Sequence, residues 1–430
     1  MDLSGEASSR LHVQSMAYQH EPLNLSRAQI RLLRLFPPRG STVTAQVAHF
    51  DFDEASPEYG PAYEAISYTW GEDVDGRTIQ IAGRHLPVGD NLYRLLNILQ
   101  HGGGGWLWID QICIDQANPK ERNHQVRMMH QIFTRALGVI AWLGDTADNS
   151  DIAMQCIADA DDPNGYRAFP LLKATQAALV ALVLRPYWSR LWILQEVIAA
   201  KTVQLMRGQK TVDWTYFETF FDFHHRFCVN YAPAFRNAHT IVRARSETEP
   251  RTLFTLLLRF TDRGCKDMRD KVYGLIGLVP YDVDLAIDYE KPIETVLFDV
   301  LRAIHGDPYH DHAFENFSYV SGLFYNLIEI ALHLRRKLGV FSIEEEDLVK
   351  EILRKADPAL LGEAGKLTQM EPESPVEFIC ERILRSSWIW DMQGDIETGG
   401  DRNRSETLPY DPTALIPALP RTDEPAQRRS

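Results

Sequence analysis

The 430-residue chain contains little cysteine, and no arrangement of it that is typical of a disulfide framework or a zinc site. The cysteines are odd in number, widely scattered and without a C-x-x-C pair: Cys113, Cys156, Cys228, Cys265 and Cys380. Secreted proteins that depend on disulfides usually have an even number of cysteines at characteristic spacings. We therefore expect reduced thiols, as in an intracellular protein.

Long hydrophobic runs are also missing. No apolar segment reaches the roughly 20 residues that a membrane-spanning helix needs. The first residues, MDLSGEASSR, lack the basic segment and apolar stretch of a signal peptide. Asp2 stands where N-myristoylation requires glycine. The sequence therefore predicts a cytoplasmic protein with no membrane span.

Positive charge is in the minority. The chain has 45 Lys and Arg against 59 Asp and Glu, which gives a net charge of −14. A chain of this charge is repelled by nucleic-acid phosphates unless it concentrates basic residues locally, and no convincing basic segment stands out. We expect no nucleic-acid partner.

Motifs of several enzyme classes do not occur. The sequence has no GxGxxG and no GxSxG, and no Lys-Ser/Thr pair follows the glycine run Gly102–Gly105 as it would in a P-loop. His305, His310 and His312 lie in the loop-like segment HGDPYHDH, where nothing places them on one face, so a solvated turn is favoured over a metal site. We expect no metal and no bound cofactor.

What the sequence does contain is a regular alternation of short apolar segments and helical stripes from 61 to 210. Strands apolar on both faces that alternate with helices are typical of a parallel sheet covered on both sides. The fold class expected is therefore α/β. The predicted strands that define it are Tyr63–Thr69, Trp106–Asp110, Val139–Leu143 and Thr202–Met206.

The rest of the chain divides into three parts. Residues 1–60 predict an N-terminal extension with two short strands, Ile30–Phe36 and Val43–Phe52. Residues 211–392 are mainly helical by their apolar spacing. Residues 393–430 are rich in proline and charge and have no periodicity, so they predict a disordered tail.

Polar residues at the predicted strand ends are the first candidates for a site. Asp110 ends one apolar strand, and Ser67 lies near the end of another. Open α/β sheets bind ligands at the carboxyl ends of their strands. The alternative is that Asp110 only caps a neighbouring helix or turn, and the two interpretations stand about even. For Cys113, a buried structural thiol is favoured over a nucleophile.

The segment RPYWSRLWILQEVIAA, residues 185–200, predicts a nearly all-apolar helix that begins at Pro186. On one helix, Trp188, Trp192 and Glu196 would form a single stripe. A carboxylate on such a helix must be paired, because burying it bare is costly. Two interpretations stay open: an ion pair with Arg190 or another arginine, and a pocket carboxylate between indole rings.

Six ordered segments of the chain resemble the fungal heterokaryon-incompatibility (HET) domain family. The resemblance implies an intracellular protein of non-self recognition and programmed cell death, acting by self-association or with another incompatibility protein. It places the HET domain at 61–210, followed by a helical extension. The segments are SYTWG (67–71), LWIDQICIDQ (107–116), ERNHQVRMMHQIFTRA (121–136), VIAWLG (139–144), RPYWSRLWILQEV (185–197) and RDKVYGLIGL (269–278).

HET domains are similar to TIR domains, which share a flavodoxin-like parallel sheet and in some cases cleave NAD with a glutamate in a W-C-x-x-E pattern. Trp192 and Glu196 have that spacing, although Ile193 takes the cysteine position. The resemblance thus implies an alternative function, a glycohydrolase acting on NAD or a related nucleotide. Glu196 would be catalytic, and the substrate-binding residues would be Ser67, Trp70, Asp110 and Trp192.

The composition of the tail yields a first prediction. Residues 405–430 offer few apolar side chains for burial, so their deletion is expected to leave the melting temperature unchanged. Thermal unfolding of the full chain and of the chain ending at residue 404 measures this. A drop of several degrees would contradict it.

Overall fold

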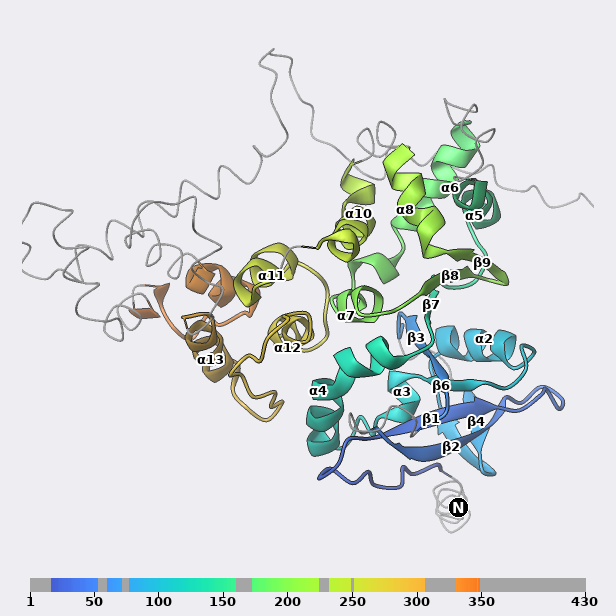
Figure 1. The fold of residues 1–430 in the computed structure, drawn as a ribbon, viewed down its shortest axis with the longest axis horizontal. Coiled ribbons are helices and arrows are strands. Elements are labelled where there is room, and N and C mark those ends of the chain that lie inside the picture. The colour runs from blue at the N-terminus through green and yellow to red at the C-terminus, as the bar shows by residue number, and fades with distance from the viewer. Residues whose placement is uncertain are drawn as a thin grey trace, which may run out of the picture.

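The structure is a computed structural model that describes residues 17–52, 60–71, 77–159, 172–223, 232–248, 251–305, 330–345 and 347–348. Its centre is a nine-stranded mixed sheet in the order β5-β4-β2-β1-β6-β3-β7-β8-β9 (Figure 1). The strands are β1 Gln29–Leu35, β2 Thr44–Asp51, β3 Tyr63–Tyr68, β4 Thr78–Ile81, β5 Arg84–Pro87, β6 Trp106–Trp108, β7 Val139–Trp142, β8 Val203–Arg207 and β9 Lys210–Asp213.

Four strands, β6, β3, β7 and β8, run parallel side by side. They are the four strands predicted from the apolar segments, and this part of the prediction is confirmed. Each is apolar because helices cover it on both sides. In chain order the strands lie 2-1-3-4 across the sheet, so the chain crosses back over β3 to place β7.

The parallel strands are the centre of a mixed sheet, because three hairpins add antiparallel neighbours at both sides. β1 pairs antiparallel with β2 and with β6, β4 with β5, and β8 with β9. The turn between β4 and β5 has only two residues, Ala82 and Gly83, too short for a parallel crossover. The strands of the predicted N-terminal extension are thus part of the same sheet as β3.

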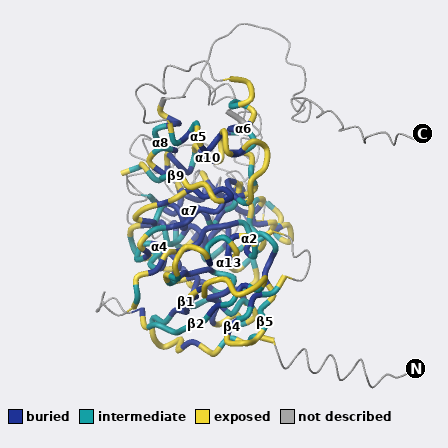
Figure 2. The backbone as a smooth tube through the Cα atoms, turned by 90° about the vertical axis from the view of Figure 1, so that its right-hand side faces the viewer, coloured by how far each residue is buried: buried dark blue, intermediate teal, exposed yellow. Residues whose placement is uncertain are grey.

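Helices pack on both faces of this sheet. On one face, α2 (Asp90–Leu99) buries Leu92, Leu95 and Leu96 in an apolar cluster with β1, β3 and β4. On the other face lie α4 (Pro119–Arg135), α7 (Ile193–Ile198) and the helices that follow, which share a larger cluster. Buried residues are concentrated around α7 at the centre of the molecule (Figure 2). The shorter elements nearby are α3 Asp110–Cys113, α5 Ser150–Ala158, α6 Lys173–Val183 and the 3₁₀ helix η3 Pro186–Ser189.

Beyond β9 the described chain is helical. Five described helices lie within the stretch 211–392 that the apolar spacing predicts to be mainly helical. Residues 330–337 are also helical, while residues 349–392 of that stretch and the tail from 393 lie outside the described residues. The helices are α8 Trp214–Phe223, α10 Ala232–Ser246, α11 Leu253–Phe260, α12 Asp270–Ile276 and α13 Ile293–His305.

None of the helices in the described part of the chain combines the length and apolar character needed to cross a bilayer. The same residues contain no group of three His, Cys, Asp or Glu side chains placed to hold a metal ion. His310 and His312, two of the three histidines weighed as metal ligands, lie outside the described residues.

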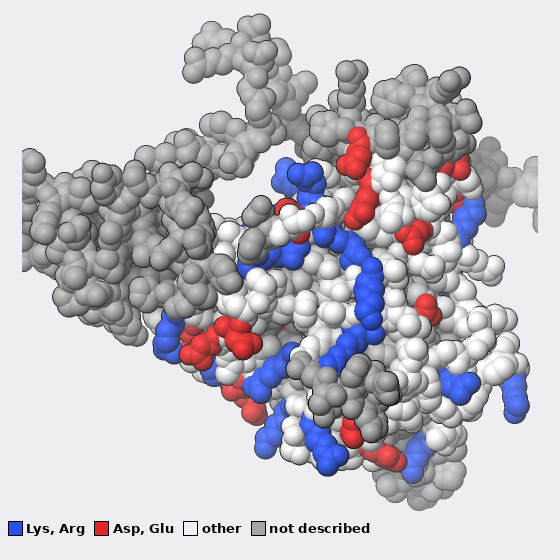
Figure 3. Space-filling view, in the orientation of Figure 1, with Lys and Arg blue, Asp and Glu red and all other residues white. Residues whose placement is uncertain are grey.

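Charge is unevenly placed on the surface despite the acidic composition. Lys and Arg form a continuous band down the middle of the face shown in Figure 3, while Asp and Glu form separate groups beside it. Net charge alone therefore does not describe this face, and the absence of a nucleic-acid partner stays a prediction.

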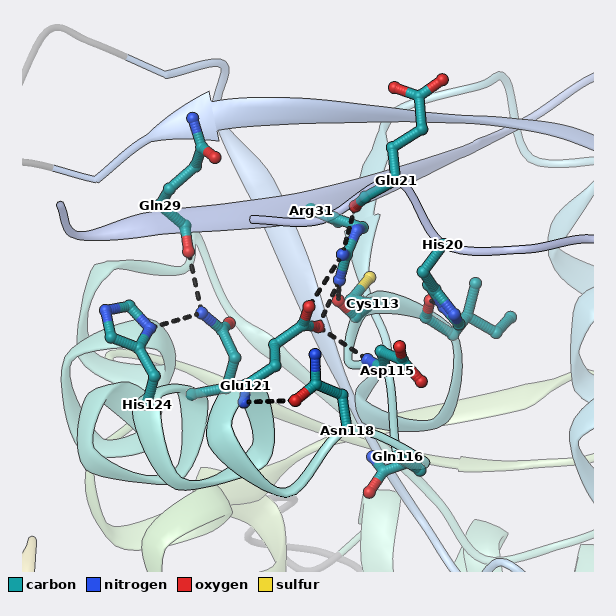
Figure 4. Close-up of polar contacts among 12 residues, drawn as sticks. His20, Glu21, Gln29, Arg31, Cys113, Asp115, Gln116, Asn118, Glu121 and His124 are labelled. Carbon is teal, nitrogen blue, oxygen red and sulfur yellow. Dashed lines mark hydrogen bonds and ion pairs between the residues drawn. The ribbon is translucent and has the colours of Figure 1, made fainter. Parts of the chain in front are cut away.

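A buried ion pair joins β1 to α4. Asn118 caps α4 by accepting hydrogen bonds from the backbone N–H groups of Lys120 and Glu121. This start directs Glu121 toward Arg31 of β1, whose Nη1 lies 2.5 Å and Nη2 3.0 Å from the two carboxylate oxygens (Figure 4). Arg31 also donates to the carbonyl of Cys113. Burial acts to raise the pKa of Glu121, but the hydrogen bonds from Arg31 and from the Asp115 backbone N–H outweigh it and lower that pKa.

Replacing one member of this pair is expected to be costly. Glu121→Gln leaves the buried Arg31 charge without its carboxylate, and the free energy of unfolding should fall by about 3–5 kcal/mol. Because the Glu121 pKa is lowered on folding, its contribution is present above the ordinary carboxyl range and is lost as the pH falls through the folded-state pKa.

Urea unfolding at pH 7 and at lower pH measures both effects. The control is Arg94→Gln, which breaks half-exposed ion pairs with Asp90 and Asp145 and should cost no more than about 1 kcal/mol. Equal costs for the two variants would contradict the assignment of Glu121 to a structural role.

Candidate functional site

The candidate residues meet at the carboxyl edge of the parallel strands. Ser67 lies at the end of β3 opposite Ala141 of β7, and Asp110 follows β6, the other neighbour of β3. Glu196 comes from α7, which packs against both β3 and β7. The sheet topology thus brings three of the five predicted site residues to one place from distant parts of the chain.

Glu196 is 2 % exposed and fully engaged in hydrogen bonds. Arg190 donates to both of its carboxylate oxygens, with Nη2 2.8 Å from Oε1 and Nη1 3.0 Å from Oε2. Ser67 donates its hydroxyl to Oε2, and the Tyr187 hydroxyl lies 2.7 Å from the Ser67 Oγ. Of the two interpretations of Glu196, the ion pair with Arg190 is the one found.

The single helix expected from 186 to 200 was wrong. The segment begins as η3, becomes extended at Arg190 and then turns into the short helix α7. The cause is Gly264, whose N–H and C=O bond the backbones of Ser189 and Leu191 in a bridge beside Arg190. This break folds the Arg190 side chain back onto Glu196. It also means that the stripe expected on one helix does not exist.

The two tryptophans of that expected stripe lie away from Glu196. Trp188 is buried, stacks on Phe217 with ring centroids 5.1 Å apart and donates its indole N–H to the Leu182 carbonyl. Trp192 packs against Gly274 of α12 and donates to Asp270. Both therefore hold the helical region against the sheet domain, and the substrate-binding role expected for Trp192 stays a prediction without a contact to support it.

Asp110 and Trp70 do come together. The Trp70 indole N–H lies 2.8 Å from Asp110 Oδ2, and the backbone N–H of Gln111 donates to Oδ1 at 2.7 Å. Asp110 is the first residue of α3, so it partly fulfils the capping alternative. Burial, followed by the charge of Glu196, raises the pKa of Asp110 to about 6, although Arg190 and the Trp70 hydrogen bond act against the shift.

Cys113 is a structural thiol in this arrangement, as favoured from the sequence. The residue is completely buried, and burial raises the pKa of its thiol to about 12. A thiol that stays protonated is a poor nucleophile.

Sequence reasoning missed two groups at this edge. Tyr187 reads as one more apolar residue of the RPYW segment, and nothing in its spacing indicates a hydroxyl bonded to Ser67. Asn91, Arg185 and Arg207 were also missed. For Arg207 the sequence held only a weak signal: it directly follows the apolar strand that was predicted to end at residue 206, and it precedes Gly208.

Comparison with known proteins places this edge in a family. The model of the heterokaryon incompatibility protein (HET) family matches residues 63–196, which run from the start of β3 to Glu196. No solved structure matches the chain.

Two curated relatives are proteins of fungal incompatibility. Heterokaryon incompatibility protein 6, OR allele, of Neurospora crassa is 24% identical, and the match covers 66% of this chain and 52% of the relative. Vegetative incompatibility protein HET-E-1 of Podospora anserina is 26% identical over 35% of this chain and 10% of its own length. The chain thus spans about half of one relative and a tenth of the other. The family match and these relatives thus identify a HET domain at residues 63–196 of this chain.

Proposed function

We propose that the chain is a cytoplasmic effector of fungal heterokaryon incompatibility, which contributes to programmed cell death after contact with non-self. It acts by associating with itself or with another incompatibility protein. The two relatives, both named as incompatibility proteins, support the biological role.

The observation that carries a non-catalytic mechanism is the engagement of Glu196. Its carboxylate is buried, paired at both oxygens with Arg190 and hydrogen-bonded by Ser67. A carboxylate that stabilises a developing positive charge must face the substrate. Glu196 instead neutralises a guanidinium, and its role here is to hold the η3–α7 segment on the end of β3.

A second candidate, a TIR-like glycohydrolase acting on NAD or a related nucleotide, is favoured by a different observation. The parallel strands lie in the order 2-1-3-4, the order of a flavodoxin-like sheet, which supports a TIR-like core. At the carboxyl edge, Asp110 and Trp70 form a carboxylate–indole pair beside the Ser67–Glu196 cluster.

In this second candidate the chemistry is cleavage of the nicotinamide–ribose bond. The bond breaks through an oxocarbenium-like state, which a nearby carboxylate stabilises. Glu196 would serve as that carboxylate once Arg190 moved aside, with Ser67, Asp110, Trp70 and Trp192 around the substrate.

The two candidates predict different behaviour for Glu196→Gln. If Glu196 is a structural partner of Arg190, the variant loses about 3–5 kcal/mol of unfolding free energy, and cell killing falls only as far as folded protein is lost. If Glu196 is catalytic as well, the variant protein that remains folded releases no nicotinamide from NAD, whereas the wild type does.

Urea unfolding, incubation of purified protein with NAD, light scattering for the oligomeric state and survival of a fungal host expressing each variant make the comparison. Glu247→Gln is the control, since it disturbs a more exposed ion pair with Arg259 and should cost no more than about 1 kcal/mol. A monomeric wild-type protein that does not kill would overturn the effector proposal.

Asp110 yields a prediction about pH. Its folded-state pKa of about 6 lies above the ordinary value of 3.8, so the folded chain holds the proton that the unfolded chain loses between these values. Stability should therefore fall as the pH rises from about 4 to 6, by up to about 1.4 kcal/mol per pH unit for one proton.

Asp110→Asn should remove this contribution from the slope, whatever it does to absolute stability. The same change at Asp145, whose pKa is lowered, chiefly by the Thr146 backbone N–H, is the control: its contribution changes below about pH 4, so the slope between pH 4 and 6 should stay nearly unchanged. Asp270 also has a pKa raised to about 6, so part of the falling slope should remain in Asp110→Asn. Identical slopes for wild type and Asp110→Asn would show that Asp110 ionises normally.

A further inference from the structure

The order in which the chain adds parallel strands to the sheet reverses at the boundary between β3 and β7. The chain leaves β3 toward α2, on one face, and leaves β7 toward α5, α6 and α7, on the other. Where the connections that follow two neighbouring strands lie on opposite faces of the sheet, the carboxyl ends of these strands leave room for a ligand. Asn91 of α2 marks the boundary, since it donates to the Thr69 carbonyl and accepts the Trp142 indole N–H.

A buried arginine with unused donors lies next to this boundary. Arg207, the last residue of β8, is 0 % exposed. Its Nη1 donates to the Leu143 carbonyl at 3.2 Å, whereas Nε and Nη2 have no hydrogen-bond partner among the described residues. Burial, and then the charge of Arg185, lowers the pKa of Arg207 to about 10. A buried guanidinium with free donors is an unusual feature that an anion would satisfy.

Gly144, two residues after the end of β7, lies beside both arginines. Its φ of +95° is one that other residues rarely adopt. A Cβ at Gly144 would stand 3.1 Å from Arg207 Nη1 and 3.9 Å from Arg185 Nη1. Two guanidinium groups thus converge on one glycine, and any side chain there would occupy the space between them.

The charges around the two arginines are incompletely balanced. Arg185 pairs with Asp148 at 3.0 Å, and its Nε has no partner within the described structure. Asp148 is 63 % exposed, and both it and Asn149 have a φ of +54°, in the left-handed region that Asp and Asn adopt more readily than other residues with a side chain. Asp145 is paired with Arg94, and Asp151 faces the site only at longer range. No carboxylate of the described residues is paired with Arg207.

We infer that Arg207 and Arg185 form a binding site for a diphosphate group at the carboxyl ends of β7 and β8, and that Asp148 occupies Arg185 when the site is empty. Arginine is suited to phosphate because its planar donors bind two oxygens at once. Asp148 is on the same chain and therefore competes at high effective concentration. A diphosphate carries more negative charge than the Asp148 carboxylate and can therefore displace it from Arg185, which a ligand with a single carboxylate would not do.

This inference does not depend on the role of Glu196 or on cell death. The proposed site uses the ends of β7 and β8 with Arg185 and Arg207, whereas the Ser67–Glu196 cluster uses the end of β3 with Arg190. The site would bind a diphosphate whether the chain is an effector or an enzyme.

The test is a calorimetric titration of the purified full-length chain with pyrophosphate, ADP and inorganic phosphate at fixed ionic strength. Pyrophosphate should bind more tightly than phosphate. Tighter binding of ADP than of pyrophosphate would identify a nucleotide as the source of the diphosphate, and equal binding would identify the diphosphate alone.

Four variants locate the site. Arg185→Gln, which changes a partly exposed residue, should weaken pyrophosphate binding at least tenfold. Asp148→Asn should strengthen it several-fold, because the competing carboxylate is gone. Arg259→Gln, which breaks a partly exposed ion pair with Glu247 in the helical region, is the control and should leave it within twofold. Arg207→Met should abolish it; if that variant fails to fold, the opposite effects at Arg185 and Asp148 still decide. No binding by wild type, or binding unchanged by both substitutions, overturns the proposal.

Discussion

The buried pair of Arg190 and Glu196 is the interaction on which the carboxyl edge of the sheet depends. It exists because Gly264, from the loop before α12, holds Arg190 in an extended conformation and interrupts what would otherwise be a helix. The pair then reaches Ser67 at the end of β3, and through Ser67 the hydroxyl of Tyr187. Charge neutralisation in the interior thus fixes a strand end, a helix start and a distant loop relative to one another.

The sequence predicted the elements whose cause is local. The apolar segments that became β3, β6, β7 and β8 are buried on both faces, and Asn118 caps α4 through its own side chain. What it did not predict depends on distant partners. The extended Arg190 requires Gly264, and the contacts of Trp192 require α12. The antiparallel hairpins escaped prediction as parts of the sheet because pairing between β1 and β6 is not encoded in either strand alone.

Three arginines in the interior or at its edge show how the same side chain takes different roles. Arg31 and Arg190 each have a carboxylate partner and link secondary-structure elements. Arg207 has only the carbonyl of Leu143. A buried charge with a partner stabilises specific packing, whereas one without a partner is costly. The lack of a paired carboxylate among the described residues separates Arg207 from the two structural arginines.

The strand order has a consequence for the boundaries of the HET domain. The matched region, 63–196, excludes β1, which pairs with β6, and β8, which pairs with β7. It also excludes Arg31 and Gly264, the partners of Glu121 and of the backbone beside Arg190. The matched segment alone therefore lacks two strands of its sheet, the guanidinium that neutralises Glu121 and the backbone bridge beside Arg190.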